Sequence, residues 1–213
     1  MKNKAVILGT GGHARTVLKI LIENDSHEIL GLFELNKYIK NEEILGCKVM
    51  GHVDNIKKKI KNIDKIDYYL AIGDNELRKK WWNRLIDGKK NLPNLISKNS
   101  HVDLTAGMLF GNTICAGVYI GPEVQIGSNN IINTGAIIEH EVRISDNNHI
   151  APGSIVAGRA VINDDCFVGA GAVIINNIHI EKETLIGAGS TMVKSNIGRP
   201  GKYLGTPAKW VSI

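Results

Sequence analysis

Residues 114–138 read ICAGVYIGPEVQIGSNNIINTGAII, with an aliphatic side chain at every sixth position. The same spacing continues in both directions over sixteen consecutive positions. These are Val102, Met108, Ile114, Ile120, Ile126, Ile132, Ile138, Ile144, Ile150, Val156, Ile162, Val168, Ile174, Ile180, Ile186 and Met192. A period of six fits neither a 3.6-residue helix nor a flat two-residue strand alternation, but it fits a short strand and a corner repeated around a coil. We therefore predict a parallel β-helix.

The residues around each aliphatic position fit the same architecture. The residue after it is often Gly or Ala, as at Gly121, Gly127 and Ala151, where a tight turn needs a small side chain. The residue two places before it is mostly small or slender, and we expect it to face inward. This second set is Val118, Val124, Asn130, Ala136, Val142, Asn148, Ser154, Ala160, Cys166 and Ala172. The period leaves the handedness of the coil open.

The first ninety-odd residues follow a different pattern. The apolar run 4–8 precedes the glycine-rich turn 9–12 and a helical pattern that continues to about Ile22. We predict further strands at about 28–33 and 67–72, a helix at 76–86 capped by Asp74 or Asn75, and a last strand and bridge at 91–100. This order predicts a small Rossmann-like α/β domain with a parallel sheet at 1–95, followed by the β-helix and a C-terminal tail at 96–213.

The turn Gly9-Thr10-Gly11-Gly12-His13-Ala14 lies where a backbone approaches a phosphate at a helix N-terminus. It differs from GxGxxG because residue 14 is Ala, and a turn that only needs the freedom of glycine at positive φ explains it equally well. Glu34 follows about twenty residues later, where an acidic residue binds a ribose hydroxyl in dinucleotide folds. The domain is too small for a full dinucleotide fold, which favours a single nucleoside diphosphate over NAD.

Composition excludes several other classes of protein. The 213 residues are 43% hydrophobic and 22% charged, without an apolar run of the roughly 20 residues that a membrane span needs. No signal-peptide pattern follows the N-terminal lysines, so we expect a cytoplasmic protein. The net charge of +5 includes the run Lys57–Lys59, which has no interleaved aromatic residues and predicts a solvated face rather than nucleic-acid binding. Cys47, Cys115 and Cys166 have no CxxC spacing, so we expect buried thiols and no metal site.

Two histidines of the repeat region are candidates for chemistry. His140 and Glu141 adjoin at a predicted corner, and His149 lies nine residues, or half an eighteen-residue coil, further on. Acyl transfer needs a base to accept a proton from the attacking nucleophile, and histidine beside a carboxylate suits this task. A surface His-Glu pair without function is the competing interpretation. No GxSxG pattern is present, so direct attack without an acyl-enzyme is the simpler mechanism.

Four segments together resemble the hexapeptide-repeat sugar acetyltransferases of the sialic acid O-acetyltransferase and bacillosamine-pathway N-acetyltransferase family. The segments are Gly9–Ala14, Ala71–Lys80, Ile138–Glu141 and Tyr203–Lys209, so the resemblance spans nearly the whole chain. It implies a left-handed β-helix, acetyl-CoA as co-substrate without a metal, and a homotrimer with active sites between neighbouring helices.

The resemblance also implies roles for individual residues. His140 matches the general base and Glu141 its supporting carboxylate, whereas His149 matches a residue that contacts acetyl-CoA near the thioester. The backbone near Gly158, Ala170 and Ala188 matches the groove of the pantetheine arm. Positions that hold the nucleotide of the sugar substrate match Gly11, Gly12, His13, Glu34 and Gly73. Two positions differ from the family: Phe33-Glu34 replaces an aspartate pair that is often present, and Ala188 replaces a glycine.

The leading hypothesis is N-acetylation of a nucleotide-linked amino sugar, with the nucleotide sugar and acetyl-CoA as partners. O-acetylation of a sialic acid or related sugar uses the same base and is the nearest alternative. A non-catalytic β-helix scaffold and a dinucleotide-dependent oxidoreductase are the competing classes, the first disfavoured by the His140-Glu141 pair.

Overall fold

The computed structural model describes residues 2–36, 42–60 and 66–212, in two compact units, Met1–Ser97 and Lys98–Ile213. Each unit is described by itself. Among these residues, no helix has both the length and the apolar character that crossing a membrane requires.

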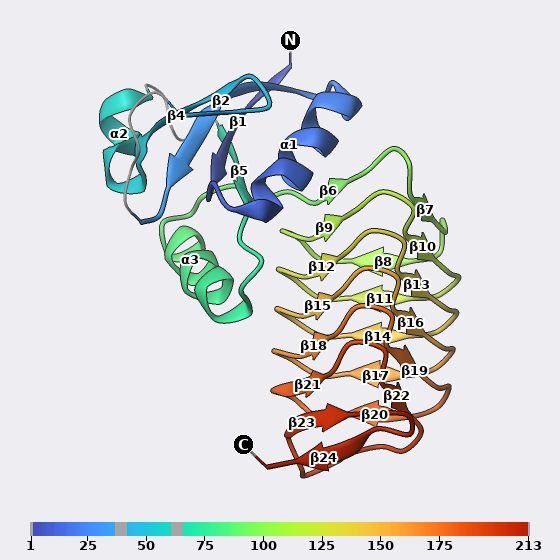
Figure 1. Ribbon diagram of the computed structural model, residues 1–213. Helices are drawn as coiled ribbons and strands as arrows, with labels where there is room; N and C mark the ends of the chain where they lie inside the picture. Colours follow the sequence, from blue (N-terminus) through green and yellow to red (C-terminus); the bar gives the residue numbers. More distant parts are fainter. Residues whose placement is uncertain (1, 37–41, 61–65, 213) are drawn as a thin grey trace. The chain divides into compact units, whose positions relative to one another are not determined.

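The first unit is a sheet of mostly parallel strands with the order β3-β4-β2-β1-β5 (Figure 1). Its elements are β1 (Asn3–Leu8), α1 (Gly12–Asn24), β2 (His27–Glu34), β3 (Glu43–Ile44), β4 (Cys47–His52), the short 3-10 helix η1 (Val53–Asn55), α2 (Ile56–Lys59), β5 (Ile66–Leu70), α3 (Asn75–Asp87) and β6 (Leu95–Ile96). Only β3 runs antiparallel to its neighbour, β4. The predicted order of strand, glycine turn, helix and strand is therefore present, with the added hairpin β3–β4 and helix α2 for which the sequence analysis predicted no element.

Burial explains why β1 is the central strand of this sheet. Its residues Ala5–Leu8 have no exposed surface, because β2 and β5 flank the strand and side chains cover both faces. On one face, Val6 and Leu8 pack in a cluster with Val53, Trp81 and Leu85. Near-continuous apolar sequence is typical of a parallel strand covered on both faces. The glycine turn thus follows directly after a strand that is fixed by the buried core.

The second unit is a left-handed parallel β-helix (Figure 1). Its first sheet contains β7 (His101–Val102), β10 (Tyr119–Ile120), β13 (Ile137–Ile138), β16 (Ile155–Val156), β19 (Val173–Ile174) and β22 (Thr191–Met192). The second contains β8 (Gly107–Met108), β11 (Gln125–Ile126), β14 (Arg143–Ile144), β17 (Val161–Ile162) and β20 (His179–Ile180). The third contains β9 (Thr113–Ile114), β12 (Ile131–Ile132), β15 (His149–Ile150), β18 (Phe167–Val168), β21 (Thr184–Ile186), β23 (Gly201–Leu204) and β24 (Lys209–Val211).

The period of six becomes a coil of eighteen residues. Ile120 pairs with Ile138, and Ile138 with Val156, so each residue lies beside the one eighteen positions later. From Ile114 to Met192, every aliphatic residue of the six-residue series is at most 3% exposed, whereas Val102 and Met108 are half-buried because no earlier coil of this unit covers them. The inward-facing second set is buried as predicted, from Val118 to Ala172.

Polar members of the inward set form a ladder. The side-chain oxygens of Asn112, Asn130 and Asn148 each accept the backbone N–H of the residue eighteen positions later, at 2.9, 2.7 and 2.7 Å. A buried side-chain carbonyl is tolerated because each coil supplies the N–H donor for the coil that precedes it in the chain.

Left-handed backbone conformation recurs along all three edges of the β-helix. The first edge, between the first and second sheets, has positive φ at Glu123, Glu141, Arg159 and Asn177. The second edge has it at Gly111, Asn129, Asn147, Asp165 and Glu183, and the third edge at Gly117, Gly135, Gly153, Gly171 and Gly189. One such residue at each corner turns the chain from one short strand to the next. Gly, Asn and Asp adopt this conformation most readily, so Glu and Arg on the first edge and Glu183 on the second are the exceptions.

Candidate functional site

His140 and Glu141 are in contact at the first edge of the β-helix. The corner that follows β13 carries both residues, and His140 Nδ1 lies 2.9 Å from Glu141 Oε2. The side chains are 48% and 38% exposed, so the pair is accessible. Because a carboxylate only accepts, Nδ1 carries the proton in this bond, and in the neutral ring the lone pair is then on Nε2. This is the arrangement that a general base requires.

Arg159 joins this pair from the next coil. Its Nε lies 2.9 Å from the same Oε2 of Glu141. Hydrogen bonds from Arg159 and then from His140 hold the pKa of Glu141 below its ordinary value, and Glu141 in turn raises the pKa of Arg159. The sequence analysis did not single out Arg159. Arg159 follows Glu141 by eighteen residues. Because eighteen residues form one coil, this spacing could have predicted that the two residues are neighbours.

Gly158 lies directly against the ring of His140. A β-carbon at Gly158 would come within 2.5 Å of both Cε1 and Nε2 of that ring. The structure thus places Gly158 on the first edge, beside the predicted base, and not beside Ala170 and Ala188.

Ala170 and Ala188 lie on the third edge, one coil apart. Both are exposed, and the backbone carbonyl of Ala170 accepts the N–H of Gly189 at 2.8 Å. Their small side chains leave the backbone of this edge open to solvent.

His149 lies on β15, in the third sheet, and is 9% exposed. Its Nε2 is 3.1 Å from Asn133 Nδ2, and its ring packs edge-on against Phe167 at 5.0 Å between centroids. Asn133 belongs to a corner of the third edge. Within one chain, His149, Ala170 and Ala188 therefore cluster on the third sheet and third edge, whereas His140, Glu141 and Gly158 lie on the first edge.

In the first unit, Gly11 and Gly12 begin α1, with Gly11 as its N-cap. Neither has positive φ, and a β-carbon at either would meet nothing within 4 Å. Gly9 is different, because its φ is 111° and a β-carbon there would lie 2.7 Å from the carbonyl oxygen of Ala71. The backbone thus requires glycine at Gly9 only, whereas Gly11 and Gly12 leave open space before the helix. His13 follows, half-buried, in the first turn.

Glu34 ends β2 and organises the loop that follows. Its Oε1 accepts the backbone N–H groups of Leu35 and Asn36 at 2.7 and 2.9 Å, and its Oε2 accepts the hydroxyl of Thr10. Burial alone would raise the pKa of Glu34, but these hydrogen bonds and the proximity of His52 lower it below its ordinary value. Glu34 therefore remains ionised beside the glycine turn.

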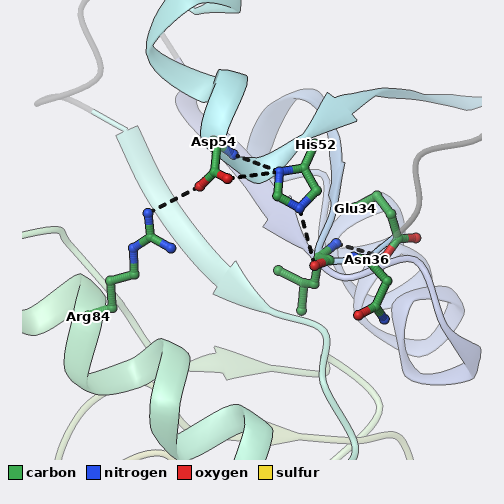
Figure 2. Close-up of polar contacts among 6 residues, drawn as sticks. Glu34, Asn36, His52, Asp54 and Arg84 are labelled. Carbon is green, nitrogen blue, oxygen red and sulfur yellow. Dashed lines mark hydrogen bonds and ion pairs between the residues drawn. The ribbon is translucent and has the colours of Figure 1, made fainter.

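Figure 2 shows a polar chain that continues from this loop to α3. His52 lies between Leu35 and Asp54, with Nε2 at 3.3 Å from the Leu35 carbonyl oxygen and Nδ1 at 3.2 Å from Asp54 Oδ2. Arg84 Nη2 contacts Asp54 Oδ1 at 3.2 Å. Arg84 and Asp54 also lie at a cavity of about 310 Å³, whose other lining residues are Leu8, Val53, Ile56, Lys57, Tyr68, Trp81, Leu85, Gly88 and Lys90.

Gly73 lies between β5 and α3, and a β-carbon there would meet nothing within 4 Å. Arg78 supports this turn from α3: it is 2% exposed, its Nη1 lies 3.4 Å from the carbonyl oxygens of Ile72 and Gly73, and its Nη2 donates to Asn75 Oδ1 at 2.8 Å. Asp74 is the N-cap and accepts the N–H of Leu77 at 2.8 Å. The sequence analysis missed Arg78, because the run Arg78-Lys79-Lys80 resembles a solvated helix face.

The candidate residues of the first unit share one edge of its sheet. Gly11, Gly12 and His13 follow β1, Glu34 ends β2, and Gly73 follows β5. These strands are parallel, so their carboxyl ends meet, and ligands of open α/β sheets bind at this edge. Across residues 2–36, 42–60 and 66–212, no group of three His, Cys, Asp or Glu side chains is arranged to hold a metal ion.

Two family models match the chain. Residues 4–85 match the PglD N-terminal domain, and residues 141–176 match the bacterial transferase hexapeptide of six repeats. No curated protein sequence matches.

Solved structures similar to the chain cover nearly all of it. A histidine-to-alanine variant of GDP-perosamine N-acetyltransferase from Caulobacter crescentus, in complex with CoA and GDP-perosamine, is 28% identical, with 99% of this chain and 97% of that chain covered and a TM-score of 0.88. PerB from Caulobacter crescentus, with the same ligands, is 29% identical over 97% and 96% of the two chains, with a TM-score of 0.85. The acetyltransferase domain of PglB from Neisseria gonorrhoeae is 21% identical over 99% and 100%, with a TM-score of 0.90, and supports the fold. Together with the family models, these likenesses show that the chain belongs to the hexapeptide-repeat sugar acetyltransferases of the sialic acid O-acetyltransferase and bacillosamine-pathway N-acetyltransferase family.

Proposed function

We propose that this acetyltransferase moves an acetyl group from acetyl-CoA to the amino group of a nucleotide-linked amino sugar. The observation that carries the proposal is the accessible His140-Glu141 pair, with the lone pair of His140 Nε2 free. The first unit supports it, because its PglD-type domain gathers small and acidic residues at the edge where nucleotides bind parallel sheets. The similar Caulobacter crescentus enzyme was solved with both CoA and GDP-perosamine.

His140 acts as the general base in this reaction. A neutral sugar amine attacks the thioester carbonyl, His140 Nε2 accepts the proton that the amine loses, and the acetyl–sulfur bond breaks to release the CoA thiolate, which takes up a proton. Glu141 holds the ring through Nδ1, and its negative charge stabilises the imidazolium that forms. The amine attacks acetyl-CoA directly, so the scheme needs no acyl-enzyme intermediate.

We assign the nucleotide of the substrate to the first unit. Gly11, Gly12 and His13 lie at the N-terminus of α1, whose backbone N–H groups suit a phosphate. Glu34 is ionised at the adjacent strand end, where a ribose hydroxyl can donate to it, and Gly73 leaves open space at the third strand.

We further propose a homotrimer in the cytoplasm, where acetyl-CoA and nucleotide sugars are made. The proposed base lies on the first edge, while His149, Ala170 and Ala188, which we assign to acetyl-CoA, lie on the third sheet and third edge. Within one chain, the proposed base and the residues assigned to acetyl-CoA therefore lie on different parts of the β-helix. Packing the first edge of one copy against the third edge of another brings them together, and threefold symmetry repeats this contact around a closed ring.

The test is a thiol-release assay with acetyl-CoA against UDP-, dTDP- and GDP-linked 4-amino sugars and free sialic acid, with the product identified by mass spectrometry. We expect turnover of a nucleotide-linked amino sugar to an amide that resists hydroxylamine. His140→Ala should lower kcat by at least a hundredfold, whereas His101→Ala, at an exposed histidine of the first coil, should not. Turnover of free sialic acid alone would establish O-acetylation instead.

A further inference from the structure

The first edge has long charged side chains at three of its four left-handed positions, whereas the second edge has one, Glu183, and the third edge has none. The third edge has Gly at every left-handed position, and the second edge has mainly Gly, Asn and Asp. On the first edge the corresponding residues include Glu141 at φ 60° and Arg159 at φ 61°. Long side chains in this conformation cost backbone free energy, and such outliers mark functional sites more often than random positions.

Glu141 and Arg159 occupy the same position on two successive coils. They are eighteen positions apart, and the backbone N–H of Arg159 donates to the carbonyl oxygen of His140 at 3.0 Å, which fixes the register of the two corners. The column therefore places opposite charges on successive coils. Glu123 precedes Glu141 in the same column, and Arg159 forms its ion pair with Glu141.

The contacts of Glu141 show what this cation does. Arg159 Nε and His140 Nδ1 both lie 2.9 Å from Oε2, so one oxygen accepts from both partners. With Arg159 in place, the carboxylate is held toward the following coil and remains ionised, which keeps it an acceptor for Nδ1.

Gly158 completes the arrangement from the same corner. Its φ is not in the left-handed region, so the backbone there permits any L-residue. The constraint is steric, because a β-carbon would lie 2.5 Å from Nε2 and Cε1 of His140. Gly158 is thus the residue that allows the ring to lie close to the next coil, within reach of Glu141.

From these contacts, and resting on the proposed function, the geometry points to Gly158 and Arg159 as positioning residues for the reaction. Gly158 makes room for the His140 ring, and Arg159 fixes Glu141 so that the proton stays on Nδ1 and the lone pair stays on Nε2. A role for Arg159 in binding a substrate phosphate is the competing reading, and the experiment separates the two.

The decisive measurement needs no substrate. Nitrogen-15 spectra of histidine-labelled protein at pH 8.5 report which ring nitrogen of His140 carries the proton, with His140→Ala identifying its signals. We expect the Nδ1–H form in the wild type and a shift toward the Nε2–H form, which free imidazole side chains prefer, in Glu141→Gln, Arg159→Gln and Gly158→Ala. Arg159→Lys should retain part of the wild-type signal, because it keeps the charge and loses the fixed Nε geometry. Arg143→Gln, which removes a cation from an exposed position of the neighbouring strand, is the matched control and should leave the signal unchanged.

Kinetics give the second readout. Arg159→Gln should lower kcat about tenfold and Gly158→Ala about a hundredfold, with KM for both substrates nearly constant, because displaced catalytic groups lose rate rather than binding. Circular dichroism checks that both variants keep the β-helix. A wild-type tautomer signal in Arg159→Gln, with a raised KM alone, overturns positioning in favour of substrate binding. If no sugar is turned over by the wild type, the proposed function fails, while the nitrogen-15 spectra still decide the roles of Gly158 and Arg159.

Discussion

Thr10 donates its hydroxyl to the carboxylate of Glu34, which ties the glycine turn after β1 to the end of β2. The same carboxylate accepts two backbone N–H groups of the following loop. The ionised form of Glu34 therefore holds two loops of the proposed nucleotide site in place before any ligand binds.

This contact makes the stability of the first unit depend on pH. Although burial opposes it, hydrogen bonding lowers the pKa of Glu34 below its ordinary value of 4.5, so ionised Glu34 stabilises the folded state. That contribution is present above about pH 4.5 and is lost as the pH falls through the lower folded-state value. We expect the urea midpoint of Glu34→Gln to lie below that of the wild type at pH 7 and the two to converge toward pH 3.5, followed by the fluorescence of Trp81 and Trp82. Glu28→Gln, at an exposed position of the same strand, should show no such convergence.

Substitutions of the glycines in the turn after β1 should affect either stability or substrate binding, depending on the position. Gly9→Ala forces a β-carbon to 2.7 Å from a carbonyl oxygen at φ 111°, and we expect a loss of about 1–3 kcal/mol in unfolding free energy. Gly11→Ala and Gly12→Ala meet open space, so their melting temperatures should stay within about two degrees of the wild type. Their KM for the nucleotide sugar should rise instead. Equal stability losses at all three glycines would contradict this assignment.

The core of the β-helix should show a sharp contrast between neighbours on one strand. Ile144 is 3% exposed and faces the interior, whereas Arg143 beside it is exposed. Ile144→Ala should cost about 2–5 kcal/mol, and Ile144→Asp, which buries an unpaired carboxylate, should prevent the second unit from folding. Arg143→Asp should leave the melting temperature nearly unchanged. Circular dichroism and thermal unfolding distinguish these outcomes.

Arg78 should be the most sensitive charged residue of α3. It is 2% exposed and donates to the turn at Gly73 and to Asn75. Arg78→Met leaves buried acceptors without their donor, and we expect a loss of about 2–4 kcal/mol, together with weaker binding of the nucleotide sugar. Lys80→Met, on the exposed face of the same helix, should be within about 0.5 kcal/mol of the wild type. A matching small loss in both variants would show that Arg78 is only a surface cation.

The β-helix was predictable because its signal is local and repeated. Each aliphatic residue contributes the same information, and Ile120 and Ile138 need no knowledge of the fold to be recognised as equivalent. The hairpin β3–β4 was missed for a physical reason. Its turn contains Leu45 at φ 48° before Gly46 at φ 76°, whereas the common sequence signal for such a turn is Asn or Asp before Gly. The sequence analysis made no prediction for Arg78, because a single arginine in a run of basic residues carries no signal of burial in the sequence alone.

The candidate site residues were predictable to different degrees. His140 and Glu141 are adjacent in sequence, and the structure confirms their contact. Arg159 and Gly158 join them only through the stacking of coils, so no local motif contains all four. The nine-residue spacing, half of an eighteen-residue coil, already predicts that His149 and His140 lie at different faces of one coil, and the three-sided coil adds the sheet and the edge to which each belongs.

The eighteen-residue coil restricts which insertions and deletions this protein tolerates. Adding or removing eighteen residues beyond Asn177 changes the height of the β-helix by one strand spacing, about 4.8 Å, and leaves every existing column in register. Adding eighteen residues between Glu141 and Arg159 preserves the fold equally well, yet it places another residue next to the His140-Glu141 pair. An insertion of one residue anywhere in the repeats turns inward-facing side chains outward. Length variation compatible with activity is therefore confined to whole coils that lie outside residues 140–188.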